Sequence, residues 1–263
     1  MELNIDGDAA LITASSSGLG KASAKALARE GANVVINGRD AGRLADARAE
    51  IEDVASGRVV THKGDLTDPD DISQLVSTTV DEFGGLDHLV TSAGGPPSGP
   101  FVETTDEDWY EAYDLLVMSV VRLVREATEA LRAGDGGNVV HITSLSVKQA
   151  IDSLVLSNSV RMSVIGLEKT LSRELAPEVR FNGVLPGPIE TERTRELLEQ
   201  AIDRGEYDSY EEGLAAKGEG NPLQRIGRPM ELGNTVAFLC SPLSAYINGI
   251  TVPIDGGLGR SNI

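Results

Sequence analysis

Two polar side chains lie four residues apart in an otherwise apolar stretch, and together they could do chemistry. Ser157 and Arg161 are neighbours of Val160, Met162 and Val164 in the sequence. Residues four apart share one face of a helix, so both side chains would point the same way. The stretch therefore predicts a polar pair on one face of an apolar helix.

The types of these groups limit the chemistry that is available. The guanidinium of Arg161 keeps its proton because the ordinary pKa of arginine is above about 12, so it cannot act as a base. It can bind a ribose, stabilise negative charge developing on an oxygen, or clamp a carboxylate or a phosphate. The hydroxyl of Ser157 is much less acidic than a phenol and needs a strong base beside it. Ser144, at the end of a predicted strand, could orient a substrate. Alternatively, Ser157 and Arg161 are merely packed or solvated.

A glycine-rich turn begins the set of elements that must position these groups. An apolar run at 9–13 leads into Ala14-Ser-Ser-Ser-Gly18-Leu-Gly20, a helix follows, and a second apolar run covers 33–37. This order opens a dinucleotide-binding βαβ unit. Small residues let backbone N–H groups approach a pyrophosphate at the positive end of the helix. The alternative is a plain connection in which the glycines serve packing alone.

The rest of the chain continues to alternate between strands and helices. We predict an α/β fold, with a single domain over residues 1–263 built on a Rossmann-type, doubly wound parallel sheet. A charged, amphipathic segment at 190–220 is predicted to be a substrate lid within that domain. The remaining strands are expected at 59–63, 88–91, 138–143, 180–185 and 251–257.

The end of the second predicted strand bears on the choice of nucleotide. It reads Asn37-Gly38-Arg39. An acid there would accept the 2′-hydroxyl of NAD, whereas glycine followed by arginine leaves room and positive charge for the 2′-phosphate of NADP. NADP(H) is therefore the preferred cofactor and NAD(H) a possible one; the alternative is that Arg39 is a solvated surface residue.

Composition excludes several classes of function. The net charge of -18 disfavours nucleic acid and anionic membranes as partners. One cysteine and three histidines leave no cluster with metal-ligand spacing, so no metal site is predicted. No apolar run is long enough to cross a membrane, and the N-terminus is acidic where a signal peptide is basic. We expect a cytoplasmic protein.

Several motifs in this order are similar to those of one family. Thr13 to Gly20 corresponds to Thr-Gly-x-x-x-Gly-x-Gly, with Ala14 in place of the first glycine, and Thr91-Ser92-Ala93-Gly94 stands where the family has Asn-Asn-Ala-Gly. The segments at 222–229 and 255–257 match its closing motifs. The chain thus resembles the short-chain dehydrogenase/reductase superfamily over nearly its whole length, and within it the classical group that includes 3-oxoacyl carrier-protein reductases.

The resemblance implies which residues hold the cofactor. Asp65 and Leu66 stand where the family contacts adenine, and Pro186, Gly187 and Thr191 match its nicotinamide-side loop. Together with Arg39, which is predicted from its charge at the end of the second strand, the full cofactor-binding set is Ala14, Ser16, Ser17, Gly18, Leu19, Gly20, Arg39, Asp65, Leu66, Thr91, Ala93, Gly94, Arg161, Pro186, Gly187, Ile189 and Thr191.

The catalytic positions depart from the family pattern. Ser144 occupies the position of the catalytic serine, but Ser157 stands where the family has its proton-donating tyrosine and Arg161 where it has a lysine. Leu116 replaces the asparagine of the proton relay. Tyr113 is a second possible donor, although such residues more often lie at subunit interfaces, and His141 is expected to be structural.

These residues are compatible with two functions. The first is an NAD(P)(H)-dependent oxidoreductase that acts on a small-molecule carbonyl or alcohol, like the 3-oxoacyl reductases, with Ser144, Ser157 and Arg161 as catalytic residues. The alternative is a catalytically silent nucleotide-binding protein that acts as a sensor or partner subunit. The resemblance also implies a homo-oligomer, a dimer or tetramer, built through two long helices.

The charge balance predicts adaptation to salt. The chain has 41 acidic residues, and only six of its 23 basic residues are lysine. At 1 M salt the Debye length falls to about 3 Å, so the repulsion among these acids is screened. We expect the thermal melting temperature to rise from dilute buffer to molar KCl. A steady fall over that range would contradict the prediction and indicate an ordinary acidic protein.

Overall fold

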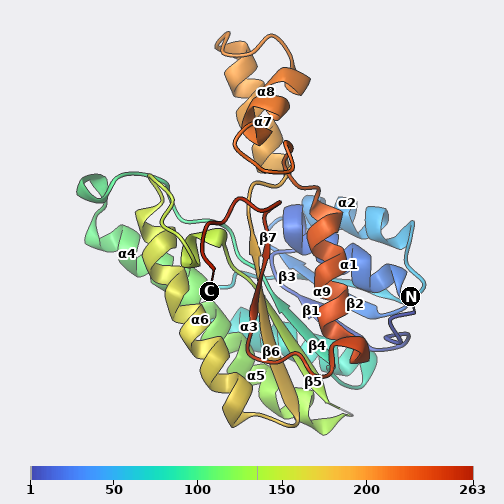
Figure 1. The fold of residues 1–263 in the computed structure, drawn as a ribbon. Helices are drawn as coiled ribbons and strands as arrows, with labels where there is room; N and C mark the ends of the chain where they lie inside the picture. The colour runs from blue at the N-terminus through green and yellow to red at the C-terminus, as the bar shows by residue number, and fades with distance from the viewer. Residues whose placement is uncertain (1, 135, 263) are drawn as a thin grey trace.

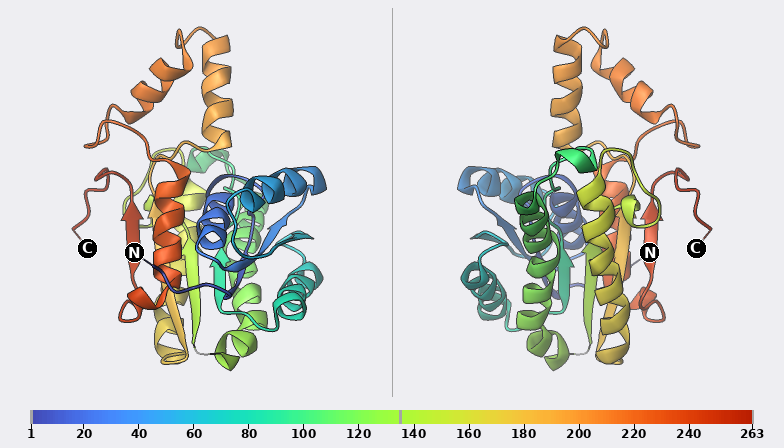
Figure 2. Two further views of the ribbon diagram at one scale, coloured as in Figure 1. Left: turned by 90° about the vertical axis from the view of Figure 1, so that its right-hand side faces the viewer. Right: turned by 90° about the vertical axis from the view of Figure 1, so that its left-hand side faces the viewer.

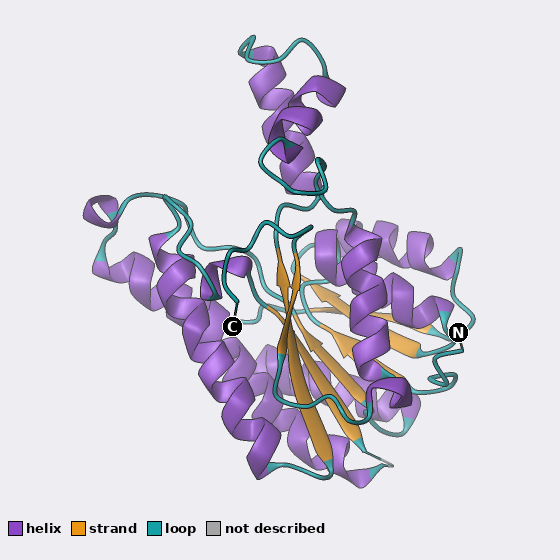
Figure 3. Ribbon diagram, in the orientation of Figure 1, coloured by secondary structure: helices purple, strands orange, loops and turns teal. Residues whose placement is uncertain are grey.

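A parallel sheet forms the centre of the molecule. The computed structural model describes residues 2–134 and 136–262. The seven strands follow the order β3-β2-β1-β4-β5-β6-β7, and every neighbouring pair is parallel (Figure 1, Figure 3). The order reverses between β1 and β4, which confirms the predicted doubly wound sheet. The strands are β1 (Ala9–Ile12), β2 (Asn33–Gly38), β3 (Val59–Lys63), β4 (His88–Thr91), β5 (Gly137–Ile142), β6 (Val179–Pro186) and β7 (Thr251–Ile254).

Helices cover both faces of the sheet and create two cores. One face carries α1 (Gly18–Arg29), α2 (Ala41–Glu52) and α9 (Pro229–Cys240), and the other carries α3 (Pro69–Phe83), α5 (Ser119–Ala133) and α6 (Val155–Glu174) (Figure 2). Successive strand residues point to opposite faces. Ile12 accordingly lies in the core beneath α1 and α9, whereas Leu11 lies in the core beneath α3 and α5.

Helix starts follow the sequence signals. Asp68 accepts a hydrogen bond from the backbone N–H of Asp70 at the start of α3. Thr105 and Asp108 form a reciprocal capping box at the start of α4 (Asp106–Tyr113). These bonds satisfy N–H groups that have no partner within the helix.

The long helical segment that begins after Thr105 is interrupted. A π-helical turn, η2 (Asp114–Met118), separates α4 from α5. The hydroxyl of Ser119 donates to the carbonyl of Leu115 within this region. A π turn inserts an extra residue and changes the direction of the following side chains, and such turns are frequent at functional sites. Both the interruption and Leu116 lie next to the candidate site described below.

The predicted lid segment folds into two helices. These are α7 (Glu192–Asp203) and α8 (Tyr210–Gly218), which project from the end of the sheet at which the strands terminate (Figure 1, Figure 2). They pack chiefly on each other, and a Cβ at Gly213 would approach Leu198 to 2.7 Å. The segment therefore stands above the sheet rather than adding to either core.

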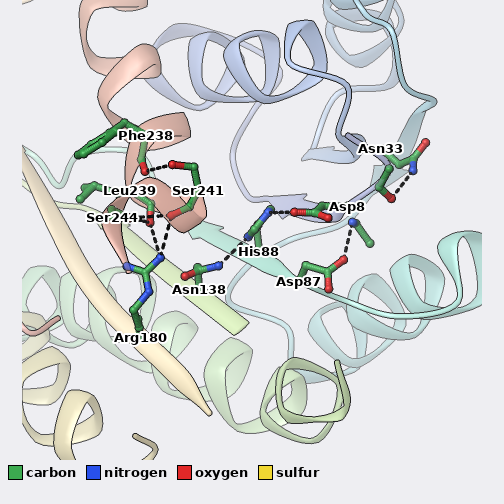
Figure 4. Close-up of polar contacts among 12 residues, drawn as sticks. Asp8, Asn33, Asp87, His88, Asn138, Arg180, Phe238, Leu239, Ser241 and Ser244 are labelled. Atoms are coloured by element: carbon green, nitrogen blue, oxygen red, sulfur yellow. Dashed lines mark hydrogen bonds and ion pairs between the residues drawn. The ribbon is translucent and has the colours of Figure 1, made fainter. Parts of the chain in front are cut away.

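A polar network joins the strands at the opposite end of the sheet (Figure 4). His88 on β4 contacts the carboxylate of Asp8 through Nε2 at 2.9 Å, and its Nδ1 accepts a hydrogen bond from the side-chain amide of Asn138 at 3.2 Å. Arg180 on β6 donates to the carbonyls of Leu239, Ser241 and Ile247. Polar side chains at this end are therefore satisfied within the protein.

Large apolar side chains are exposed on the outer face of α4 and α6. Tyr110, Tyr113 and Met162 are all exposed, as are Phe101 and Val102 just before α4. The family resemblance implies a homo-oligomer built through the two long helices, and the oligomer stays a prediction. No helix within the described residues is long and apolar enough to span a membrane.

A buried carboxyl group lies between α6 and β6. Glu168 is 1% exposed, and its Oε2 has no hydrogen-bond partner among the described residues. It fills the space above Gly183, where a Cβ would lie 2.5 Å from Oε2. Burial raises the pKa of Glu168 from 4.5 to about 8, because the ionised form loses its hydration. The carboxyl group is therefore protonated in the folded protein at neutral pH.

This group should make stability depend on pH. The pKa of Glu168 is higher in the folded than in the unfolded protein. Its contribution to the free energy of unfolding is therefore fully present below pH 4.5 and is lost as the pH rises towards 8. Glu168→Gln cannot ionise, so it should flatten this slope and raise the free energy of unfolding at pH 8 by on the order of 1–3 kcal/mol. Denaturant unfolding at several pH values measures both effects. Glu174→Gln, exposed on the same helix, is the control that should keep the wild-type slope; an equal slope in Glu168→Gln would contradict the prediction.

Candidate active site

A cleft opens at the carboxyl ends of the strands, where the strand order reverses. Its volume is about 540 Å³. Ligands of open α/β sheets bind at this position. The cleft is lined by Ala14, Ser16, Ser17, Gly18, Leu19, Gly20, Asn37, Gly38, Arg39, Arg43, Gly64, Asp65, Leu66, Ser92, Ala93, Gly94, Gly95, Leu115, Ile142, Thr143, Arg161, Thr191 and Glu192.

The glycine-rich turn forms one wall of the cleft. Asn37 holds the turn from below: its Oδ1 accepts from the N–H of Ala14 and its backbone carbonyl from the N–H of Ser15. A Cβ at Gly20 would lie 2.5 Å from the carbonyl oxygen of Ala14, so this position must be glycine. Ser17, the N-cap of α1, makes no side-chain bond to the first turn. The positive end of α1 is thus left open to an anion, as a pyrophosphate requires.

Arginines lie at the end of the cleft beside β2. Arg39 is highly exposed and 3.9 Å from Asp65, which is a weak contact. Arg43, from the first turn of α2, forms an ion pair with Glu192 at 2.8 Å and so links the sheet to the lid segment. The pKa of Asp65 is lowered mainly by the hydrogen bond from the backbone N–H of Thr67, so its carboxylate is ionised. This end of the cleft combines two arginines with two carboxylates, those of Asp65 and Glu192.

The loop after β4 forms the floor of the cleft. Thr13 donates its hydroxyl to the carbonyl of Ser92 at 2.7 Å and accepts from the N–H of Ser92 at 2.8 Å. A Cβ added at Gly94 or Gly95 would meet nothing within 4 Å. The backbone is therefore bare towards the cleft, and the space is open for a flat ligand. Together with the turn, it fits a dinucleotide.

Of the three predicted catalytic residues, the cleft exposes one. Arg161 lines it, whereas Ser144 and Ser157 are not among the described residues that do. Ser157 is buried, and its hydroxyl is 3.1 Å from the hydroxyl of Ser146. Ser144 accepts from the N–H of Ser146 at the start of a short 3₁₀ turn. Both serine hydroxyls are engaged within this loop.

Arg161 is the unusual group in the site. It is 9% exposed, and its Nε has no partner among the described residues. Burial lowers the pKa of Arg161 from 12.5 to about 10, because the charged form is desolvated. The guanidinium nevertheless stays protonated at neutral pH. The cleft therefore contains a buried positive charge next to Ile142 and Thr143, at the end of β5.

Several other predicted residues lie outside the cleft lining. Thr91 is buried and bonds Nδ1 of His141 at 2.7 Å. Burial lowers the pKa of His141 to about 4, so the ring is neutral at pH 7 and is packed in the interior. Leu116 and Tyr113 also lie outside the lining, the first buried and the second half-exposed. Pro186, Gly187 and Ile189 lie just before the lining residue Thr191.

Some lining residues were not singled out by the sequence. Asn37 and Gly64 lie at strand ends, and such positions could have been flagged from the strand pattern alone. Arg43 and Glu192 meet across 149 residues of chain, for which no local motif gives a signal. Thr143 precedes the predicted catalytic residue Ser144, and Leu115 precedes Leu116, which replaces the family's asparagine; only the geometry shows that both line the cleft.

Comparisons with known proteins agree with this geometry. Residues 13–259 match the family model described as enoyl-(acyl carrier protein) reductase. The chain is 31% identical to a 3-oxoacyl-[acyl-carrier-protein] reductase of Synechocystis over 251 residues, 95% of this chain and 96% of that one. L-sorbose reductase from Gluconobacter frateurii, solved with NADPH and L-sorbose, has a TM-score of 0.94 at 32% identity, covering 99% and 100% of the two chains. A short-chain oxidoreductase from Pseudomonas aeruginosa, described as containing an atypical catalytic centre, has a TM-score of 0.91 at 31% identity over 98% and 99%.

The turn contains one residue in a conformation that suits glycine. Ala14 has a φ of 45°, in the left-handed region, which costs an L residue about 1–2 kcal/mol. Ala14→Gly should relieve this strain. Glycine gains conformational freedom in the unfolded chain, which offsets part of that gain, so we expect a net increase of about 1 kcal/mol in the free energy of unfolding. Denaturant unfolding measures it. Ala45→Gly, exposed in the middle of α2, should instead lose about 1 kcal/mol; a similar loss in Ala14→Gly would show that the turn is unstrained.

Proposed function

Since the chain belongs to the short-chain dehydrogenase/reductase family of oxidoreductases, we propose that it is an NADP(H)-dependent enzyme that interconverts a small-molecule carbonyl compound and an alcohol. The observation that supports this most strongly is the protonated guanidinium of Arg161 in the wall of a cleft shaped for a dinucleotide. Reduction would take a hydride from the nicotinamide to the carbonyl carbon and a proton from solvent to the oxygen.

The residues that would hold the nucleotide follow from the cleft. The open end of α1 and the small residues before it, Ser16 to Gly20, would bind the pyrophosphate. Asp65 and Leu66 would flank the adenine end, and the bare backbone at Gly94 would face the ring system. Arg39 and Arg43 would take the 2′-phosphate, which supports NADP(H) over NAD(H). The L-sorbose reductase that this chain resembles is solved with NADPH.

Arg161 would then stabilise negative charge during the reaction. A fixed donor in a partly dry cleft stabilises negative charge that develops on the substrate oxygen more strongly than water does. The hydroxyl of Ser157 is poorly placed to deliver the proton, because it is buried against Ser146. Water would then supply the proton. Ser144 lies outside the cleft lining, but within the described chain its hydroxyl only accepts from the N–H of Ser146, so it keeps a proton with which it would orient a substrate that reaches it.

A second function has its own support. The buried hydroxyl of Ser157 and the apolar side chain of Leu116 leave no proton relay of the kind found in the family. These two observations favour a protein that binds the nucleotide without turnover and acts as a sensor or a partner subunit.

Binding and turnover measured on one preparation separate the two functions. We expect NADPH, followed by its fluorescence, to bind at least tenfold more tightly than NADH, because Arg39 and Arg43 line the end of the cleft in which the 2′-phosphate would bind. A screen of ketones with NADPH and of alcohols with NADP⁺, followed by absorbance, should then reveal turnover. Binding of NADPH without turnover of any compound would support the silent alternative.

Two variants sharpen the result. Arg39→Gln should weaken NADPH binding about tenfold and leave NADH binding nearly unchanged, since only one charged contact is removed. Arg48→Gln, on the exposed part of α2, is the matched control that should change neither. The double variant Ser157→Tyr with Arg161→Lys restores the family's usual pair; if this variant also binds NADPH and turns nothing over, the enzyme hypothesis is wrong.

A further inference from the structure

We infer that Arg161 is the binding subsite for a carboxylate group of the substrate, so that the natural substrate is an anionic carbonyl or hydroxy acid. The inference rests on the proposed function, because it assigns the substrate class of that same cleft. Arg161 differs from Arg180 in the hydrogen bonds that its guanidinium makes. Arg180 is partly buried and donates to the backbone carbonyls of Leu239 and Ser241 (Figure 4) and to that of Ile247. Arg161 is 9% exposed and forms no hydrogen bond or ion pair with any described residue.

No carboxylate among the described residues pairs with this guanidinium. The smaller cavity beside Arg161 is otherwise lined only by apolar and hydroxylic side chains, among them Leu116, Thr143 and Val164. The carboxylates that line the larger cleft, Asp65 and Glu192, pair with Arg39 and Arg43 instead. Leaving a cation buried and unpaired destabilises a protein by several kcal/mol. A ligand that supplies negative charge removes this penalty most fully, which identifies an anion as the missing partner.

The volumes of the two cavities point to the main cleft as the place of the ligand. The smaller cavity that Arg161 lines has a volume of about 10 Å³, which is room for a single water at most. The larger cleft that Arg161 also lines has a volume of about 540 Å³. Ser157 is a small residue buried against Ser146, so no bulky side chain at that position fills the space near the guanidinium. A planar carboxylate can meet the guanidinium there through two parallel hydrogen bonds.

The charge of the whole protein makes a local cation necessary. With a net charge of -18, the molecule repels anions as they approach. A neutral substrate would need no buried arginine, whereas a carboxylate must be held by a contact strong enough to overcome this repulsion. The ribose hydroxyls of the nucleotide are a weaker alternative partner, because they are neutral and offset the buried charge only in part.

A pair of small probes tests the inference directly. Oxamate carries a carboxylate, and oxamide is its uncharged analogue. With the wild-type protein saturated by NADPH, calorimetry should show oxamate binding at least tenfold more tightly than oxamide, at an ionic strength matched with KCl. Arg161→Lys retains the charge but loses the two-bond geometry, so it should weaken oxamate binding at least tenfold, and by a larger factor than it weakens NADPH binding. Arg48→Lys makes the same change at an exposed site and should alter neither affinity.

The outcomes separate the inference from the proposed function. Equal binding of oxamate and oxamide would overturn the inference, as would a loss of NADPH binding in Arg161→Lys that equals or exceeds the loss for oxamate, since Arg161 would then serve the ribose. If the wild-type protein binds no NADPH, the proposed function fails. The melting temperature of the cofactor-free protein then decides the inference: oxamate should raise it for wild type and not for Arg161→Met, and a shift equal in both proteins or absent from both would overturn it. A folded Arg161→Met is recognised by a cooperative melting transition.

Discussion

The cleft depends on one pair of hydrogen bonds between two strand ends. Thr13 follows β1 and Ser92 follows β4, and the hydroxyl of Thr13 both donates to and accepts from the backbone of Ser92. At this point the chain leaves neighbouring strands in opposite directions, because the order of the sheet reverses there. The two bonds hold the strand ends together below the place where the connections diverge. The gap above them is the nucleotide cleft, and its walls come from the diverging loops.

Small residues then determine how closely the walls approach each other. Gly20 packs against the carbonyl of Ala14, and Gly38 packs against Ser16, with no room for a Cβ at either position. Their contacts place the start of α1 directly over the end of β2, where Arg39 begins the next loop. Ala14 adopts a glycine-like φ because Asn37 and the strand below fix the turn from two sides. The geometry of the turn is therefore imposed by its surroundings rather than by its own sequence.

Much of the fold could be predicted from the sequence, because local patterns determine its elements. The apolar runs predicted the parallel strands that the structure confirms, and the capping side chains of Asp68 and Thr105 stand where α3 and α4 begin. The π turn at Asp114–Met118 could not be predicted, since its residues would suit an ordinary helix equally well. The hydrogen bond between the hydroxyls of Ser157 and Ser146 could not be predicted either. It depends on how a 3₁₀ turn folds back on α6, and a serine eleven residues from another gives no periodic signal.

The two helices above the sheet have a consequence for how such a protein can change over evolutionary time. Because α7 and α8 pack chiefly on each other, their residues contribute little to the two cores that hold the sheet together. The main tie seen from α7 to the opposite wall is the ion pair of Glu192 with Arg43, and an exposed pair of this kind stabilises a fold by about 1 kcal/mol at most. Substitutions, and even changes of length, in this segment can therefore accumulate without unfolding the domain. The substrate range can diversify there while the nucleotide cleft is left intact.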